Sequence, residues 1–359
     1  MTESPSVVTI LGAGAMGSAL ATPLRERGHE VRLWGTWLDD HLLDAVEAGK
    51  PHPRTNVDLP EGTLLFRSAE LEASLDGADL VILAVASVGV EEVTRLAAER
   101  VSAIGTLAVT SKGFIADAEG TVRLLPESIT AIFESLGLPT PQIVAAGGPC
   151  KANEVAAGRP TATVYGSADV ESARRVARVI QTDDYRVETI SDYVGLEIAA
   201  PLKNVYAISL GFADGLAETS PEPWHNLRSA FFAQALREMA EIAIDWGGEA
   251  ETVYGLAGSG DLEVTGLSGR NKVYGARIGA GETALVALQA MIDAEQTVEG
   301  VPASALAVQM AKQRFDDAEV RLPLLFAIAR VVDGAASPLI DLLSAALPPQ
   351  IGDPIPLTT

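Results

Sequence analysis

The chain is poor in the residues that build disulfides and metal centres. Among 359 residues there is one cysteine, Cys150, which excludes an internal disulfide and a zinc site made of several thiolates. The four histidines show no ligand-like spacing, so we expect no metal site; they are His29, His41, His52 and His225. The chemistry of this protein must therefore come from other side chains or from an organic cofactor.

Long apolar runs are also missing. The longest, such as residues 80–86, fall well short of the roughly 20 residues that cross a bilayer, so we expect buried strands and no membrane span. The start of the chain shows no basic region followed by an apolar stretch, which predicts no secretory signal and a cytoplasmic location. A hydrophobic content of 48% excludes wholesale disorder.

Basic residues are scarce relative to acidic ones. The net charge of −22 argues against nucleic-acid binding, because most of the surface would repel a phosphate backbone. An anionic ligand would need local basic residues. Since the chain has only six lysines, each lysine beside a glycine-rich segment is informative.

The order of patterns predicts two domains. Short β-branched runs alternate with helical patterns in the first half, which is typical of a doubly wound parallel sheet covered by helices, a Rossmann-type α/β domain spanning residues 1–190. From residue 191 the apolar positions recur at helical spacing, which predicts an all-α substrate domain over 191–345 and an irregular tail over 346–359. The expected strands are residues 7–11, 30–34, 80–85, 106–110, 143–146, 161–165 and 185–189.

A glycine-rich loop follows the first expected strand directly. It reads Gly12-Ala13-Gly14-Ala15-Met16-Gly17 and leads into a helical pattern, which is GxGxxG in the context that a dinucleotide-binding loop requires. The first glycine permits a tight turn, the second lets the backbone approach a pyrophosphate, and the third allows close packing of the helix. The helix N-terminus then offers its free N–H groups to the anion.

The end of the second strand carries the information on coenzyme type. The acidic residue that usually binds the ribose 2′-hydroxyl is replaced by Trp34-Gly35-Thr36-Trp37, and Asp39 and Asp40 come later. No arginine follows the strand immediately to pair with a 2′-phosphate. We therefore expect NAD in preference to NADP.

Three further segments carry candidate catalytic residues. Lys112 follows the fourth core strand, at the edge where doubly wound folds bind their ligands. Lys203 and Asn204 lie in an apolar helical stretch, where desolvation would lower the pKa of a lysine as a general acid requires. A third segment, Gly255-Leu256-Ala257-Gly258-Ser259-Gly260-Asp261, leads to Thr265 and then to Arg270-Asn271, whose guanidinium suits a phosphate.

Together these segments resemble the NAD(P)-dependent glycerol-3-phosphate dehydrogenase family, from Val7 to about Ile340. The similar pieces are GAGAMG, RGHEVRLWG, SKGF, EVAAGRPTA, DYVGLEIAAPLKN, GLAGSGDL, GRN and the EG of Glu299-Gly300, in the same order. The resemblance implies hydride transfer between a nicotinamide cofactor and the pair of dihydroxyacetone phosphate and glycerol 3-phosphate. It also implies a place in glycerol phosphate metabolism and phospholipid biosynthesis, and a homodimer.

The resemblance assigns roles by position. Lys203 would protonate the developing alkoxide, Asp261 and Thr265 would orient Lys203 or the substrate, and Lys112 would polarise the carbonyl. The substrate and its phosphate would be held by Asn204, Arg270 and Asn271. The cofactor contacts would be Gly12, Gly14, Ala15, Met16, Gly17, Trp34, Thr36, Ser87 and Glu299, and the site would lie between the two domains.

Some positions depart from the family pattern. The run near the nicotinamide reads Gly147-Gly148-Pro149-Cys150-Lys151, with Lys151 in place of an apolar residue, and Val85-Ala86-Ser87 replaces Val-Pro-Ser. An inward Lys151 would be a further substrate contact and would favour a different phosphorylated ketone or polyol, or a hydroxy acid; an outward Lys151 would be an ordinary surface lysine. A non-catalytic NAD(P)-binding sensor is a further alternative, although the proposed catalytic residues are all retained.

Overall fold

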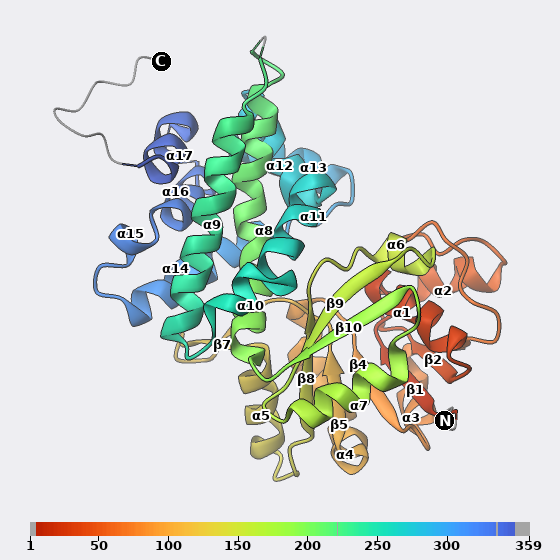
Figure 1. Ribbon diagram of the computed structural model, residues 1–359. Coiled ribbons are helices and arrows are strands. Elements are labelled where there is room, and N and C mark those ends of the chain that lie inside the picture. Colours follow the sequence, from red (N-terminus) through yellow and green to blue (C-terminus); the bar gives the residue numbers. More distant parts are fainter. Residues whose placement is uncertain (1–4, 221, 335–336, 349–359) are drawn as a thin grey trace. The chain divides into compact units, whose positions relative to one another are not determined.

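A computed structural model describes residues 5–220, 222–334 and 337–348. The chain divides into two compact units, which we describe separately (Figure 1). The first unit runs to Ile115 and resumes over Arg123–Glu197; the second comprises Ala116–Val122 and the chain from Ile198 onward. The expected boundary at residue 190 precedes this division by seven residues. Of the expected tail 346–359, residues 349–359 lie outside the described part of the chain.

The first unit contains an eight-stranded sheet in the order β10-β9-β8-β5-β4-β1-β2-β3. From β3 to β8 neighbouring strands are parallel, whereas β9 and β10 are parallel to each other and β9 is antiparallel to β8. The sheet is thus mostly, not wholly, parallel. The strands are β1 (Val7–Leu11), β2 (Glu30–Trp34), β3 (Leu64–Phe66), β4 (Leu80–Leu83), β5 (Thr106–Val109), β8 (Gln142–Gly147), β9 (Thr161–Gly166) and β10 (Tyr185–Ile190).

Helices cover both faces of this sheet, as the doubly wound expectation requires (Figure 1). One core lies under α1, α6 and α7, and a second core lies under α3, α4 and α5. In the middle of the sheet, β1, β4 and β5 bury nearly every residue, which explains their mostly apolar sequences, whereas β3 and β10 at its edges keep exposed residues. The helices of this unit are α1 (Ala15–Glu26), α2 (Asp40–Glu47), α3 (Leu71–Leu75), α4 (Val90–Ile104), α5 (Leu125–Ser135), α6 (Ala152–Ala156) and α7 (Val170–Ile180), with single turns η1 (Ser68–Glu70) and η2 (Ser87–Gly89).

The strand order changes direction between β1 and β4, which are neighbours although two strands separate them in sequence. In open α/β sheets the crevice outside the carboxyl ends of the strands at such a point receives the ligand. The loops after β1, β4, β5 and β8 all leave this edge, because these strands are parallel. The topology therefore gathers the glycine-rich loop with residues 84–87, 110–113 and 148–151.

The second unit consists of helices and also includes part of a short hairpin that was not predicted. In that hairpin, β6 (Phe114–Ala116) pairs with β7 (Val122–Leu124), and the turn is fixed by Gln309 and Gln313, which both donate hydrogen bonds to the Gly120 carbonyl. The helices are α8 (Tyr193–Leu216, which begins in the first unit), α9 (His225–Asp245), α10 (Ala250–Tyr254), η3 (Leu256–Gly260), α11 (Asp261–Ser268), α12 (Arg270–Gly279), α13 (Ala284–Asp293), α14 (Gly300–Arg314), α15 (Ala318–Arg321), α16 (Pro323–Val332) and α17 (Pro338–Ala346).

Glycines set the distance between α8 and α12. A Cβ on Gly211 or Gly215 of α8 would lie 2.0 Å from a backbone oxygen of α12. A Cβ on Gly275 or Gly279 of α12 would lie 1.9 or 2.1 Å from a backbone oxygen of α8. Both helices thus carry two glycines four residues apart at their contact, and their backbones touch directly. Of the predicted site residues, Lys203 and Asn204 lie on α8, and Arg270 and Asn271 lie on α12.

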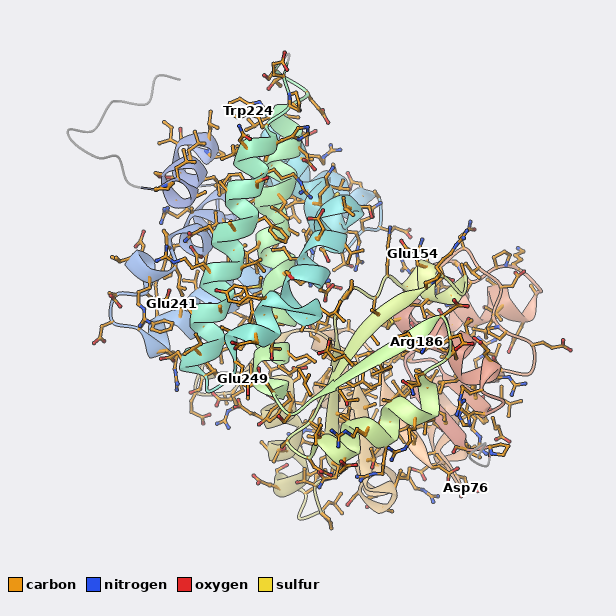
Figure 2. All side chains as sticks on the ribbon, in the orientation of Figure 1. Asp76, Glu154, Arg186, Trp224, Glu241 and Glu249 are labelled. Carbon is orange, nitrogen blue, oxygen red and sulfur yellow. The ribbon has the colours of Figure 1, made fainter. Side chains whose placement is uncertain are left out.

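Acidic side chains are spread over the surface of both units, which accounts for the strong negative charge (Figure 2). Asp76, for example, has a side chain that is 78% exposed. Within the described residues, no helix combines the length and the apolar character that crossing a membrane demands.

The glycine contact yields a stability prediction. We expect Gly275→Ala to lower the free energy of unfolding by about 1–3 kcal/mol, because its methyl group would overlap the rigid Ile208 carbonyl. Urea denaturation of the full chain, followed by circular dichroism, measures this. Gly89→Ala is the matched control, since a Cβ there would meet only Val85 at an ordinary 3.6 Å. Equal stability of the two variants would contradict the interpretation.

Candidate functional site

Two of the three loop glycines are required by the chain's own packing. Gly12 has φ of +113°, and a Cβ on it would lie 2.9 Å from the Ala84 carbonyl and from Val85. A Cβ on Gly17 would lie 1.9 Å from the Gly12 oxygen. These two glycines bring α1 close to β1 and bring the loop against the segment that follows β4, at the switch point of the sheet.

The packing of the chain does not require a glycine at position 14. Its φ is −71°, which any residue adopts, and a Cβ there would meet nothing within 4 Å. The space beside Gly14 is therefore left open by the protein itself, immediately before the first turn of α1, which begins at Ala15. A dinucleotide pyrophosphate fits this arrangement, since it needs close backbone approach and the N–H groups of a helix N-terminus.

The loop after β2 is organised by Asp39. Its Oδ2 accepts hydrogen bonds from Thr36 N and Oγ1, both at 2.9 Å, and from Ala13 N in the glycine-rich loop at 3.3 Å. Thr36, a predicted cofactor contact, is thus tied to Asp39. The side chain of Trp34 is 1% exposed and donates to the Ser68 carbonyl, so it belongs to the core. Only the backbone of Trp34 is left to contact a cofactor.

The remaining predicted residues of the first unit follow β4, β5 and β8. A Cβ on Gly113 would lie 2.5 Å from Ser87 Cβ, so the segment holding Lys112 lies directly against Ser87. Lys112 and Lys151 are both half-buried. The thiol of Cys150 lies 3.8 Å from the Tyr185 hydroxyl and packs against the core, and Lys151 is the N-cap residue of α6.

A buried acid near Lys112 was missed by the sequence analysis. Glu197 is 1% exposed, and among the described residues nothing donates a hydrogen bond to its Oε2. Burial raises the pKa of Glu197 to about 8, against the opposing effects of the Lys112 charge and the Leu125 N–H. Its only sequence signal is an acid within the apolar start of α8.

Lys203 is the centre of a buried polar cluster in the second unit. It is 9% exposed, and its Nζ donates to Asp261 Oδ1 at 2.7 Å and to Thr265 Oγ1 at 2.8 Å. Asp261 and Thr265 are four residues apart on α11 and so face the same side of that helix. The structure therefore brings together the three residues that the sequence analysis grouped as lysine and orienting partners.

A turn of π-helix delivers Asp261 to this position. η3 (Leu256–Gly260) is π-helical, with Gly260 N bonded to Gly255 O at 3.2 Å, and α11 begins at the next residue. A Cβ on Gly258 would lie 2.0 Å from the Val253 oxygen, so glycine is needed at the centre of the turn. Turns of this kind occur often at functional sites.

A second network joins the predicted phosphate and substrate residues. Asn271 Nδ2 donates to Asn204 Oδ1 at 3.0 Å, and Asn204 Nδ2 donates to Glu299 Oε2 at 3.1 Å. The other oxygen of Glu299 lies 3.1 Å from Arg270 Nη2, and both side chains are about half exposed. Asn271 Oδ1 accepts from Gly300 N at 2.8 Å. Glu299, predicted as a cofactor contact, thus holds Arg270 and Asn204.

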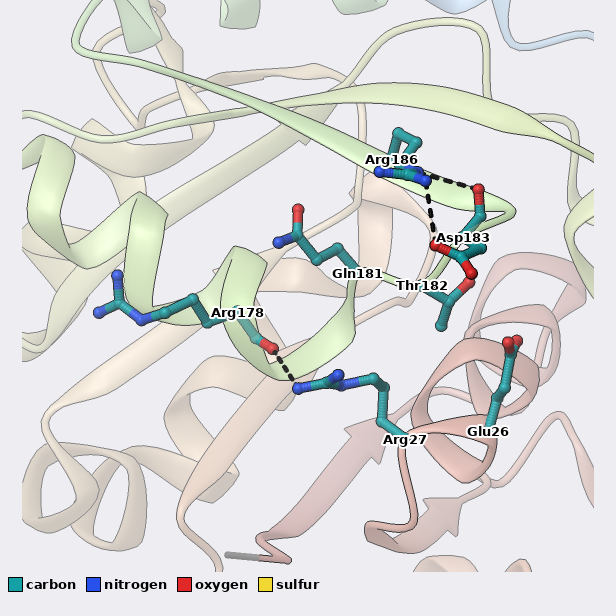
Figure 3. A pocket seen from close by; sticks show the side chains of 7 residues that line it. All are labelled: Glu26, Arg27, Arg178, Gln181, Thr182, Asp183 and Arg186. Carbon is teal, nitrogen blue, oxygen red and sulfur yellow. Dashed lines mark hydrogen bonds and ion pairs between the residues drawn. The ribbon is translucent and has the colours of Figure 1, made fainter. Parts of the chain in front are cut away.

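A depression elsewhere on the first unit is lined by none of the predicted site residues. Figure 3 shows a depression at the ends of α1 and α7, where Arg186 pairs with Asp183. It is lined by Glu26, Arg27, Arg178, Gln181, Thr182, Asp183 and Arg186. Within residues 5–220, 222–334 and 337–348, no group of three or more histidine, cysteine, aspartate or glutamate side chains is arranged to hold a metal ion.

Comparison with known proteins agrees with this arrangement. The family described as NAD-dependent glycerol-3-phosphate dehydrogenase N-terminus matches residues 7–173, and its C-terminus counterpart matches residues 192–340. An NADP(+)-dependent glycerol-3-phosphate dehydrogenase of Archaeoglobus fulgidus is 38% identical over 275 residues, 77% of this chain and 80% of the relative. A glycerol-3-phosphate dehydrogenase [NAD(P)+] of Thiobacillus denitrificans is 34% identical, covering 90% of this chain and 93% of the relative.

Solved structures show the same fold. The glycerol-3-phosphate dehydrogenase of Coxiella burnetii superposes with a TM-score of 0.80 at 30% identity, covering 95% of this chain and 98% of that chain. The Plasmodium falciparum glycerol-3-phosphate dehydrogenase has a TM-score of 0.82 at 20% identity, covering 97% of each chain. With the motifs, both family matches and these relatives in agreement, the chain belongs to the NAD-dependent glycerol-3-phosphate dehydrogenase family.

Proposed function

We propose that this protein interconverts dihydroxyacetone phosphate and glycerol 3-phosphate, using NAD or NADP. The observation that carries the proposal is the buried ammonium of Lys203, held by Asp261 and Thr265 within the unit that also presents Arg270 and Asn271. Family membership supports the same activity. The open space beside Gly14 supports a dinucleotide as the coenzyme.

The reduction needs a hydride at the carbonyl carbon and a proton at the carbonyl oxygen. The bound nicotinamide would supply the hydride. Lys203 Nζ would donate the proton as the oxygen gains negative charge, and would take it back from the hydroxyl in the oxidation direction. Asp261 and Thr265 would fix the direction of Nζ, and Lys112 would stabilise the charge that develops on the oxygen.

The substrate's phosphate would be held by Arg270, with Asn204 and Asn271 orienting the rest of the molecule. In the structure Glu299 already pairs with one edge of the guanidinium of Arg270. Since a guanidinium offers five N–H donors, Arg270 can keep Glu299 and still bind a phosphate. Glu299 would then act first by positioning Arg270, in addition to the cofactor contact that the family resemblance implies.

Lys151 is the residue that favours the alternative substrate. It follows β8 at the carboxyl edge, beside the loops that carry Lys112 and the glycines. A longer or more anionic phosphorylated ketone would use this charge. A panel of phosphorylated ketones and hydroxy acids, assayed with wild type and Lys151→Ala, shows whether the enzyme prefers dihydroxyacetone phosphate or a longer, more anionic substrate.

Coenzyme preference, assembly and location are finer points. The expectation of NAD over NADP stays a prediction, which parallel assays with NADH and NADPH test; the Archaeoglobus relative is named for NADP. We also propose a homodimer, a cytoplasmic location and a role in supplying glycerol phosphate for phospholipid biosynthesis. Light scattering of the purified protein tests the first of these.

Lys203→Ala tests the proton donor. We expect kcat for reduction of dihydroxyacetone phosphate to fall by about 10²–10⁴-fold, because a positioned general acid contributes that much. The KM for coenzyme should stay within roughly twofold, since no N–H to the dinucleotide is removed. Lys312→Ala is the matched control; Lys312 lies on α14, over the ring of Phe326 on α16. A near-normal kcat for Lys203→Ala would contradict the assignment of Lys203 as the proton donor.

Arg270→Ala tests phosphate recognition. We expect the KM for dihydroxyacetone phosphate to rise by about tenfold to 100-fold, the effect of losing hydrogen bonds to a charged group. The rate with dihydroxyacetone, which lacks the phosphate, should be the same in the variant and in wild type. The control is Arg277→Ala: Arg277 lies on the same helix as Arg270 and forms a comparable ion pair with Glu282, beyond the end of that helix. An equal loss with both substrates would show that Arg270 does not bind the phosphate.

A further inference from the structure

The peptide groups on either side of Ala13 are held by two side chains that come from outside the glycine-rich loop. Ala13 N donates to Asp39 Oδ2 at 3.3 Å, and the Ala13 carbonyl oxygen lies 2.9 Å from His52 Nε2. Ala13 is fully buried and His52 is 1% exposed. Ala13 stands between Gly12 and Gly14, so the loop that is proposed to bind the dinucleotide is fixed at its middle.

The hydrogen bonds of His52 define its tautomer. Its Nδ1 accepts from the Arg54 backbone N–H at 3.3 Å, so the ring proton is assigned to Nε2, which donates to the Ala13 carbonyl. The neutral ring satisfies both contacts at once. A second proton on Nδ1 would remove the acceptor that Arg54 N–H uses.

The segment around His52 is itself rigid. His52 N donates to Val57 O at 2.9 Å, and its carbonyl accepts from Thr55 N and Asn56 N at 3.1 and 2.8 Å. Asn56 has φ of +56°, as such a tight turn requires. His52 therefore reaches the loop from a closed turn, and its position does not depend on the coenzyme.

Fixing the Ala13 carbonyl also fixes the next N–H. The Ala13–Gly14 peptide is trans, like every described peptide bond, so its carbonyl and the Gly14 N–H point in opposite directions. With the carbonyl held by His52, Gly14 N–H points away from that ring. Gly14 is the residue beside which the protein leaves open space.

We propose that His52 is a positioning residue for the coenzyme: its Nε2–H holds the Ala13 carbonyl and so aims the Gly14 N–H at the pyrophosphate. Asp39 assists by holding the other peptide of Ala13. This inference rests on the proposed use of a dinucleotide. It assigns His52 no part in hydride or proton transfer.

Burial favours the neutral form of the His52 ring. It lowers the pKa of His52 from its ordinary 6.5, and the charges of Arg54 and His41 act in the same direction. The bond to the Ala13 carbonyl and the charge of Asp39 oppose this shift. Because the pKa is lowered, the ring is neutral above pH 6.5. The Nε2–H that holds the Ala13 carbonyl is present in both the neutral and the protonated ring, so variants are compared at one pH in the neutral range.

Three variants of the full chain test the inference. His52→Ala removes the donor, and His52→Gln keeps an amide N–H near the position of Nε2. His41→Gln is the matched control, because His41 is an exposed histidine on α2. The dissociation constants of NADH and NADPH are measured by fluorescence titration without substrate, at about pH 7.5, where the ring is neutral. The kcat with dihydroxyacetone phosphate is measured at saturating coenzyme.

We expect His52→Ala to weaken coenzyme binding by about tenfold above pH 7, the effect of one buried hydrogen bond, with kcat within roughly twofold of wild type. His52→Gln and His41→Gln should both bind as wild type there. Wild-type affinity in a folded His52→Ala overturns the inference. If His52→Ala does not fold, wild-type affinity in a folded His52→Leu, which fills the same space without a donor, overturns it.

The outcome is separate from that of the proposed function. Wild type that binds coenzyme but does not reduce dihydroxyacetone phosphate refutes the proposed reaction and leaves the binding data to judge His52. Wild type that binds neither NADH nor NADPH refutes both.

Discussion

The direct backbone contact between α8 and α12 is the constraint on which the polar site of the second unit depends. Four glycines let the two helices approach until a Cβ would overlap a carbonyl oxygen. Asn204 on α8 and Asn271 on α12 can then bond at 3.0 Å, and Glu299 joins both helices through Asn204 and Arg270. A wider separation would break this short amide contact first, because side chains of this length have little reach to spare. The four glycines thus set the helix separation that the hydrogen bonds of the site require.

The fold was predictable where sequence pattern and burial coincide. β1 and β2 begin and end at the expected residues, because each is a short run with buried apolar side chains that is followed directly by glycine. β3, with only three residues, is too short to show a period, and the hairpin of β6 and β7 depends on contacts of Gly120 with residues some 190 positions later. The reversal of β9 was also hidden, because apolar periodicity carries no strand direction.

The candidate site was predictable in part. A lysine and an asparagine within an apolar helix, and an acid after a glycine-rich turn, indicated the cluster that forms around Lys203. Two acids could not be foreseen: Asp39 reaches back 26 residues to Ala13, and Glu197 lies near Lys112 across 85 positions of sequence. Both placements follow from tertiary packing, which leaves no local signal. Trp34 was misleading for the same reason, since its side chain turns into the core.

The π-helical turn before α11 makes the length of this segment as important as its composition. A π turn accommodates one more residue than an α turn. The turn is closed by the bond from Gly260 N to Gly255 O, so removing a single residue between Gly255 and Asp261 breaks the turn that delivers Asp261 and Thr265 to Lys203. Variants of this chain should therefore tolerate substitution of the exposed residues in this segment but keep its number of residues unchanged. Tolerated insertions should lie outside the segment.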